Sequence, residues 1–152
     1  MSLQDRHRDD IPDVERFAEA WDAFVLAIRR SQARGLQSPE DLTLAQYYLL
    51  RPLENERGVA LSRLAESAGI APPTATRIID GLEKAGLVNR ERSDTDRRTV
   101  LVSLTSTGRR RVVRKRTELA DRRRRLYENL EPDERRQSER LLRHLAELIG
   151  QL

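Results

Sequence analysis

Residues 62–98 restrict the fold of this chain more than any other segment. A short helix is predicted over residues 62–68, and Gly69 after it permits a sharp turn. A second helix is predicted over residues 72–85: it begins with a proline, which the first helical turn tolerates, and Gly86 ends it. Two helices joined by a tight turn are the layout of a helix-turn-helix.

A pair of strands follows this helix pair directly. The predicted strands are Val88 to Arg92 and Thr99 to Leu104, and the second alternates apolar residues as a strand of a small sheet does. A hairpin in this position adds a wing to the helix-turn-helix. The combination indicates binding of duplex DNA rather than catalysis.

The tip of the hairpin, residues 93–98, places two arginines next to two aspartates. Turn chemistry alone explains aspartates in a tight connection. In the other interpretation, the carboxylate of Asp94 or Asp96 holds Arg97 extended. An extended arginine is then ready to enter the minor groove, where narrow A·T tracts attract cations. Under that interpretation, Arg97→Ala weakens operator binding and leaves the oligomeric state unchanged.

Positive charge is concentrated in the middle of the chain. The net charge is −3 over residues 1–76, +9 over residues 77–125 and −2 over residues 126–152, within a total of +4. Cationic side chains gain affinity for DNA by releasing its counterions, so double-stranded DNA is the expected partner. A basic helix that only faces solvent shows the same excess of positive charge, so the charge supports DNA binding without proving it.

A recognition helix contacts bases mainly through its first turns, and a wing contacts the backbone or the minor groove. Threonine methyl groups fit against thymine, and arginine reaches guanine or phosphate. The candidate DNA-binding residues are therefore Pro73, Thr74, Thr76 and Arg77 on the helix, and Arg92, Asp94, Asp96, Arg97 and Arg98 on the wing.

The rest of the chain is predicted to be helical, which gives a mainly α fold with a small β-hairpin wing. Thr43 and Gln46 form a candidate capping box, and Pro52 is expected to bend or end the helix that they start. Thr105 or Ser106 caps the helix after the wing. The predicted flanking helices are 13–34, 44–55, 106–129 and 132–150.

The final helix carries an apolar stripe at helical spacing. Such a stripe either packs within one subunit or joins two copies, and the small size of the core favours a homodimer. Residues 1–36 and 106–152 are then a helical dimerisation region, and residues 37–105 are the winged helix-turn-helix, within a single intertwined domain. The candidate dimerisation residues are Leu141, Leu142, Leu145, Leu148 and Ile149.

The arginine-rich segment after the wing has two parts. Arg109 to Arg111 follow the wing directly and are expected to reach flanking phosphates. Arg122 to Arg125 lie more than three helical turns further on. They are expected to face solvent or to pair with acids such as Glu118, Asp121 and Glu128 at helical spacing.

Four segments carry a resemblance to a known family. They are Leu61-Ser62-x-Leu64-Ala65, Thr76-Arg77-x-x-Asp80-x-Leu82-Glu83-Lys84-x-Gly86-Leu87-Val88-x-Arg90, Asp96-Arg97-Arg98 and Leu104-Thr105-x-x-Gly108. Together they resemble the multiple antibiotic resistance regulator (MarR) family over about residues 61–108. The resemblance implies a homodimeric transcription regulator with dimerisation helices at both ends, usually a repressor. It also implies that a small, frequently aromatic or anionic molecule often releases the DNA. The pair Pro72-Pro73 departs from the polar residues common at that place.

The resemblance also suggests a place for an effector. In the resembled fold, the helices that carry the aromatic side chains meet between the dimer part and the DNA-binding part. Aromatic walls near an arginine suit a flat anion, although Phe17 and Trp21 also fit a role in the core or the interface. The candidate effector residues are Phe17, Trp21, Tyr47 and Tyr48.

Several other functions lack the residues that they need. The sequence contains no cysteine, and its two histidines, His7 and His144, form no helical metal-binding pair, so no metal is expected. No nucleophile elbow or phosphate loop is present, so neither an enzyme nor a cofactor is expected. No apolar run reaches membrane-spanning length, and the N-terminus lacks the apolar centre of a signal peptide, so the cytoplasm is the expected location. The alternative function is a winged-helix module that binds a protein or RNA and has no operator.

Overall fold

The computed structural model describes residues 11–34, 38, 40–96 and 98–151. The mainly helical fold with a small sheet that the sequence predicted is confirmed. In chain order the elements are α1 (Ile11–Arg34), α2 (Leu44–Leu50), the 3₁₀ helix η1 (Arg51–Glu54), β1 (Val59–Ala60), α3 (Leu61–Ser67), α4 (Pro72–Lys84), β2 (Val88–Arg92), β3 (Val100–Leu104), α5 (Ser106–Glu128) and α6 (Pro132–Ile149).

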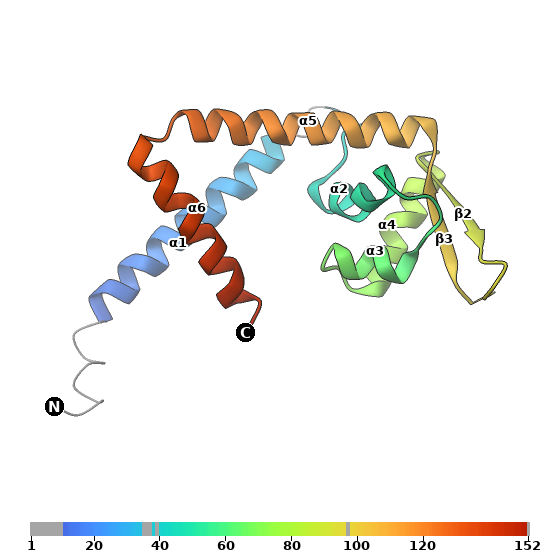
Figure 1. Ribbon diagram of the computed structural model, residues 1–152, viewed down its shortest axis with the longest axis horizontal. Helices are drawn as coiled ribbons and strands as arrows, with labels where there is room; N and C mark the ends of the chain where they lie inside the picture. The colour runs from blue at the N-terminus through green and yellow to red at the C-terminus, as the bar shows by residue number, and fades with distance from the viewer. Residues whose placement is uncertain (1–10, 35–37, 39, 97, 152) are drawn as a thin grey trace, which may run out of the picture.

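The long helix α5 joins two parts of the molecule (Figure 1). The helices α2, α3 and α4 and the β2–β3 hairpin lie beside its N-terminal half, and we call this part the winged unit. The helices α1 and α6 cross each other beside its C-terminal half, and we call α1, α6 and that half of α5 the arm.

The winged unit has a core of its own. Each buried apolar side chain of the described residues lies between Leu42 and Val112. The arm leaves large apolar side chains exposed on both α1 and α6. The core consists of Leu42, Tyr47, Leu49, Leu50, Leu53, Val59, Leu64, Ala65, Ala75, Ile79, Leu82, Leu87, Val88, Val102 and Val112.

The sheet has three strands, whereas the sequence predicted a pair. Strand β3 lies in the centre and pairs antiparallel with β2 and with β1, where Val59 lies opposite Val102. The prediction missed β1 because a two-residue strand shows no alternation of apolar and polar side chains. The register of β2 with β3, from Val88 opposite Leu104 to Arg92 opposite Val100, fixes the wing as a regular hairpin.

Side-chain caps set the starts of two helices. The predicted capping box of α2 is confirmed: the Gln46 amide donates to Thr43 Oγ1 over 3.2 Å, and the Thr43 amide donates to Gln46 Oε1 over 2.9 Å. The α-helix ends at Leu50 rather than at residue 55, because Pro52 has no amide to donate and the chain tightens into η1. At the start of α5, Thr105 Oγ1 accepts from the Gly108 amide over 3.0 Å.

Gly108 and Gly81 give opposite predictions for stability. A Cβ atom at Gly108 would lie 1.9 Å from the carbonyl oxygen of Leu87, whereas a Cβ atom at Gly81 would meet nothing within 4 Å. We expect Gly108→Ala to lower the free energy of unfolding by about 1–3 kcal/mol, because α5 must move away from Leu87. Gly81→Ala is expected to raise it by about 0.5–1 kcal/mol, since glycine is costly inside a helix. Urea unfolding followed by circular dichroism measures both, and equal stability of the two variants would contradict the packing described at Gly108.

Candidate nucleic-acid interface

The helix α4 has one face in the core and the other in solvent. Ala75, Ile79 and Leu82 are buried against the winged unit. Gly69, with φ of +62°, makes the turn that sets α4 against α3. All four residues predicted to contact bases from this helix are exposed: Pro73, Thr74, Thr76 and Arg77.

The first turn of α4 presents few hydrogen-bond donors. Pro72 and Pro73 lack amide hydrogens, and Ala71 at the N-cap makes no side-chain cap bond. The Thr76 hydroxyl donates to the Pro72 carbonyl oxygen over 3.0 Å, so it is occupied within the helix. The start of α4 therefore offers pyrrolidine rings and threonine methyl groups, which suit apolar contact with thymine methyl groups.

A charged clamp holds the wing against α4. Arg90 on β2 forms ion pairs with Asp80 and with Glu83, in the second case over 3.3 Å between Nε and Oε2. The Arg90 side chain is 21% exposed, because it shares the inward face of β2 with the buried Val88. These ion pairs were not predicted, although an arginine on the inward face of a strand needs a partner. The clamp fixes the angle between recognition helix and wing.

The tip of the wing is organised around Asp96. Its carboxylate accepts from the Arg98 amide over 3.0 Å and from the Thr99 hydroxyl over 3.0 Å. These bonds agree with the first interpretation of the tip, in which the aspartates serve to stabilise the turn. Asp94 is exposed, and Arg97, the residue predicted to enter the minor groove, lies outside the described residues.

A groove joins the recognition helix to the root of the wing. It has a volume of about 240 Å³ and brings Thr76 of α4 together with Arg98 of the wing. The other lining residues are Leu61, Ser62, Ala65, Pro72, Thr99 and Val100. Two residues that the sequence predicted separately, on the helix and on the wing, thus lie on one surface.

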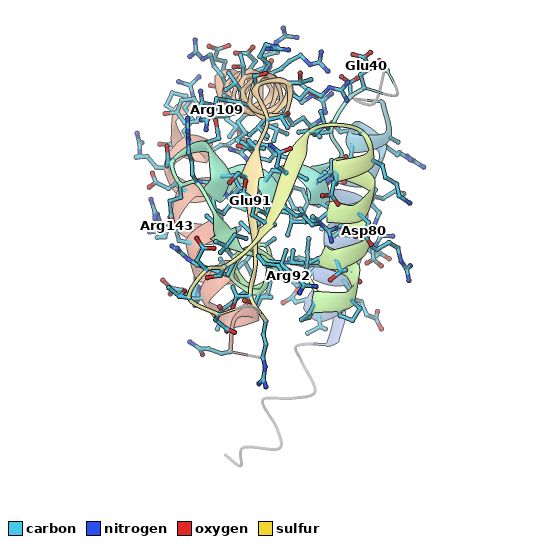
Figure 2. The ribbon with its side chains drawn as sticks, turned by 90° about the vertical axis from the view of Figure 1, so that its right-hand side faces the viewer. Glu40, Asp80, Glu91, Arg92, Arg109 and Arg143 are labelled. Atoms are coloured by element: carbon cyan, nitrogen blue, oxygen red, sulfur yellow. The ribbon has the colours of Figure 1, made fainter. Side chains whose placement is uncertain are left out.

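Unlike Arg90, the exposed cations of α4 and the wing have no carboxylate partner within the described part of the chain. Figure 2 shows the wing with Arg92 on β2 and Asp80 on the neighbouring α4. The side chains concerned are exposed and form no ion pair with a described residue. We call them the unpaired cations: Arg77, Lys84, Arg92 and Arg98.

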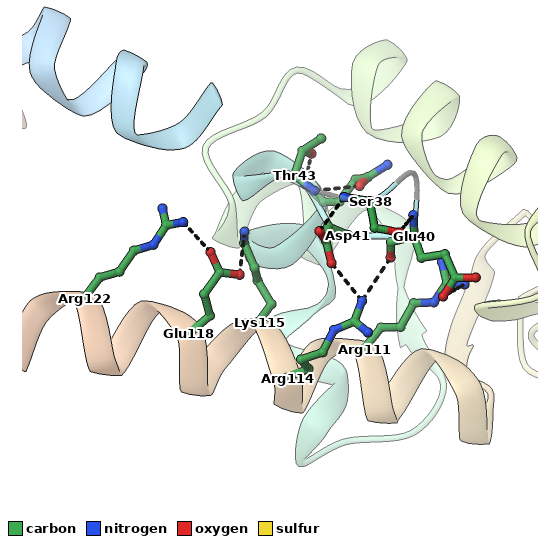
Figure 3. Close-up of polar contacts among 10 residues, drawn as sticks. Ser38, Glu40, Asp41, Thr43, Arg111, Arg114, Lys115, Glu118 and Arg122 are labelled. Carbon is green, nitrogen blue, oxygen red and sulfur yellow. Dashed lines mark hydrogen bonds and ion pairs between the residues drawn. The ribbon is translucent and has the colours of Figure 1, made fainter. Parts of the chain in front are cut away.

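The cations of α5 differ, because carboxylates and carbonyl groups hold many of them (Figure 3). Arg114 pairs with Asp41 over 2.9 Å, and the Arg109 guanidinium donates to the Glu54 carbonyl oxygen over 2.7 Å. The Arg109 guanidinium is therefore held by the backbone in one chain, and contact of Arg109 to Arg111 with phosphate stays a prediction. Further ion pairs are Arg111–Glu40, Lys115–Glu118, Arg116–Glu54 and Arg122–Glu118.

The four aromatic residues predicted for an effector do not line a common pocket in one chain. Phe17 and Trp21, with ring centroids 6.1 Å apart, lie in an apolar groove of about 400 Å³ between α1 and α6. Tyr47 is buried in the winged unit, and Tyr48 lines a separate cleft with Arg51 and others. The prediction of one shared pocket is wrong for a single chain because α1 crosses α6, and not α2, at this point (Figure 1).

The apolar stripe predicted for dimerisation is largely exposed on α6, and Leu145, Leu148 and Ile149 line the groove against α1. Leu142 is 57% exposed, and Leu141, Leu148 and Ile149 are similarly exposed, while Leu145 is half-buried. On α1, Phe17 and Phe24 are also about half exposed. One subunit leaves this surface of the arm uncovered.

The described residues contain no group of three or more histidine, cysteine, aspartate or glutamate side chains placed to hold a metal ion. Among the helices of the described segments, none combines the length and the apolar character needed to cross a membrane. The surface features of this part of the chain are therefore the unpaired cations of α4 and the wing, and the exposed apolar side chains of the arm.

Both the sequence and the fold of this chain are similar to those of known proteins. The model of the MarR family matches residues 42–100. The uncharacterized HTH-type transcriptional regulator YhbI of Bacillus subtilis (strain 168) is 32% identical over 129 residues, which cover 83% of this chain and 79% of YhbI. The transcriptional repressor CouR, bound to a 23-mer DNA duplex, has 33% identity and a TM-score of 0.63, with 79% of this chain and 89% of CouR covered. The PcaV regulator from Streptomyces coelicolor, in complex with its natural ligand, has 28% identity and a TM-score of 0.65, with coverage of 80% and 89%.

Proposed function

The chain belongs to the MarR family of transcription regulators, and we propose that it acts as a homodimeric repressor of a pseudo-palindromic DNA operator. One observation carries the proposal. The exposed cations of α4 and the wing have no described carboxylate partner, whereas α5 is rich in paired cations. Positive charge is thus available on the surface that fits a DNA groove.

In the proposed complex, α4 enters the major groove by its first turns. Pro73 and the methyl groups of Thr74 and Thr76 contact thymine methyl groups, and Arg77 contacts guanine or phosphate. The wing follows the backbone with Arg92 and Arg98. The proposed DNA-binding set also keeps the remaining predicted wing residues, Asp94, Asp96 and Arg97.

The arm supplies the proposed dimer. Its exposed leucines on α6 and phenylalanines on α1 become buried when two copies pack symmetrically, which removes apolar surface from water. Residues 1–36 and 106–152 then form the dimerisation region, and residues 37–105 form the DNA-binding part. A two-fold axis places two copies of α4 about 34 Å apart, one helical turn of DNA. The complex of CouR with a 23-mer duplex supports DNA binding by a chain of this fold.

A small aromatic or anionic molecule is proposed to release the DNA. The complex of PcaV with its natural ligand supports regulation by a ligand. A ligand at the junction of arm and winged unit changes the spacing of the two recognition helices. Because both helices must fit half-sites at a fixed spacing, a small rotation at this junction lowers operator affinity.

Selection from random duplexes tests the proposed function. We expect the purified protein to enrich a pseudo-palindrome of roughly 16–22 base pairs, with half-sites about one helical turn apart. Sequencing of the bound pool gives the operator and its symmetry. A pool without any enriched sequence would contradict operator binding, and a single isolated half-site would contradict the symmetric dimer.

A further inference from the structure

The outer face of α4 is defined by the side chains that the helix buries on its other side. Ala75, Ile79 and Leu82 are turned into the core. With about 100° of rotation per residue, Pro73 and Arg77 lie almost opposite the middle of that buried face. Both side chains are exposed, so they form the centre of the surface that α4 presents to a DNA groove.

Pro73 offers the edge of a base no group that forms a hydrogen bond. Its side chain is a saturated ring, and its nitrogen carries no hydrogen. Pro73 is the second residue of α4, so its carbonyl oxygen accepts within the first turn of the helix. Apolar contact is therefore the contribution that Pro73 makes to base recognition.

The carboxylates of α4 are engaged elsewhere. A free carboxylate on a recognition helix selects cytosine, because it accepts a hydrogen bond from the N4 amino group. Asp80 and Glu83 are the two carboxylates of α4, and both form ion pairs with Arg90 on β2. Recognition of a pyrimidine by α4 therefore does not depend on a free carboxylate that selects the cytosine amino group.

Apolar contact in the major groove selects one particular group of the DNA. The base edges present hydrogen-bond donors and acceptors there, and thymine adds the methyl group on its C5 atom. 5-Methylcytosine carries a methyl group on the same ring atom, whereas uracil and cytosine carry hydrogen. A purely apolar contact thus treats thymine and 5-methylcytosine alike and distinguishes both from their unmethylated counterparts.

We propose that Pro73 is a specificity-determining residue that reads the C5 methyl group of one pyrimidine in each half-site, whether the base is thymine or 5-methylcytosine. The inference rests on the proposed operator binding and adds a regulation to it, because methylation of a cytosine at that position strengthens binding. Arg77 lies one turn further along the same face, about 6 Å along the helix axis. At about 3.4 Å per base pair, a guanine that Arg77 contacts lies within about two base pairs of that pyrimidine.

Four versions of the selected operator separate the methyl group from the rest of the base. At each thymine of the half-sites, changed in both half-sites together, the pair is T·A, U·A, 5-methylcytosine·G or C·G. Fluorescence anisotropy with the purified full-length protein measures the four affinities. At one thymine position we expect T·A to be bound about fifteenfold more tightly than U·A, and 5-methylcytosine·G more tightly than C·G by the same factor. Burial of one methyl group gives about a fourfold gain in each half-site.

Two proline substitutions assign the methyl effect to one residue. Pro73→Ser removes the ring and is expected to cancel both methyl effects, while the other contacts keep operator binding measurable. Pro72→Ser is the matched control, because it removes the same ring from the adjacent residue. Pro72 lines the groove at the root of the wing and lies about 100° away around the helix, so Pro72→Ser is expected to keep both methyl effects.

The outcomes distinguish this proposal from the proposed function. Equal affinities for T·A and U·A at every thymine, or a selected operator without thymine in its half-sites, would overturn the role of the methyl group and leave operator binding intact. A methyl effect in T·A without one in 5-methylcytosine·G would overturn it as well, since the base would then be read by more than its methyl group. Methyl effects that survive Pro73→Ser would reject the role of Pro73. A selection that enriches no duplex would contradict operator binding itself, and this proposal with it.

Discussion

Leu142→Glu is expected to convert the proposed dimer into monomers and to lower operator affinity by at least about a hundredfold. Leu142 lies in the exposed apolar stripe of α6 and is 57% exposed in one subunit. Moving the new carboxylate from water into an apolar interface costs free energy, which opposes association of the two copies. A monomer holds only one half-site and loses the advantage of two linked binding events. Analytical ultracentrifugation and fluorescence anisotropy measure the two effects.

Arg140→Glu is the control for this substitution. Residues 140 and 142 lie about 200° apart around a helix, so Arg140 is on the other side of α6. The control changes the charge by more than Leu142→Glu does, and yet it is expected to leave the dimer intact. A Leu142→Glu protein that remains dimeric would contradict the proposed interface.

Replacement of Arg77, Arg92 and Arg98 by alanine is expected to lower operator affinity by at least about a hundredfold while the dimer stays intact. A contact of an arginine with a base contributes about 1–3 kcal/mol, and a contact with phosphate adds affinity by releasing counterions. In a symmetric dimer each substitution removes its interaction from both half-sites. The three side chains are exposed and form no ion pair with a described residue, so their removal breaks no described salt bridge of the fold. Fluorescence anisotropy with the selected operator gives the affinity.

A second triple variant removes the same charge elsewhere. Arg124, Arg125 and Arg140 are exposed and lie on the C-terminal part of α5 and on α6, away from the wing (Figure 1). Their replacement by alanine is expected to change operator affinity far less. Equal losses of affinity in the two triple variants would mean that net charge, and not the surface of α4 and the wing, determines binding.

Local signals made much of the fold predictable. The capping box at Thr43, the interruption at Pro52 and the limits of β2 each depend on a few neighbouring residues, and all three are confirmed. The pairing of Arg122 with Glu118 also follows from helical spacing. Such signals need no knowledge of the tertiary structure.

Contacts between distant segments were not predictable in the same way. Arg114 pairs with Asp41 across 73 positions, and Arg109 reaches the Glu54 carbonyl oxygen across 55. No periodicity connects such residues, so the sequence showed the excess of arginine on α5 without showing which cations are held. The clamp of Arg90 on Asp80 is closer in sequence, but it depends on the angle between β2 and α4. The predicted effector residues were separated for the same reason, because the crossing of α1 with α6 is a tertiary feature.

The salt dependence of operator binding tests most directly whether the unpaired cations of α4 and the wing bind DNA. For the unmodified protein, the logarithm of the association constant is expected to fall steeply and linearly with the logarithm of the salt concentration. The Arg77, Arg92 and Arg98 triple variant is expected to show a slope that is smaller by about 0.9 for each phosphate that it no longer neutralises. The Arg124, Arg125 and Arg140 variant is expected to keep the original slope. A flat response of the unmodified protein, or one common slope for all three proteins, would contradict the account.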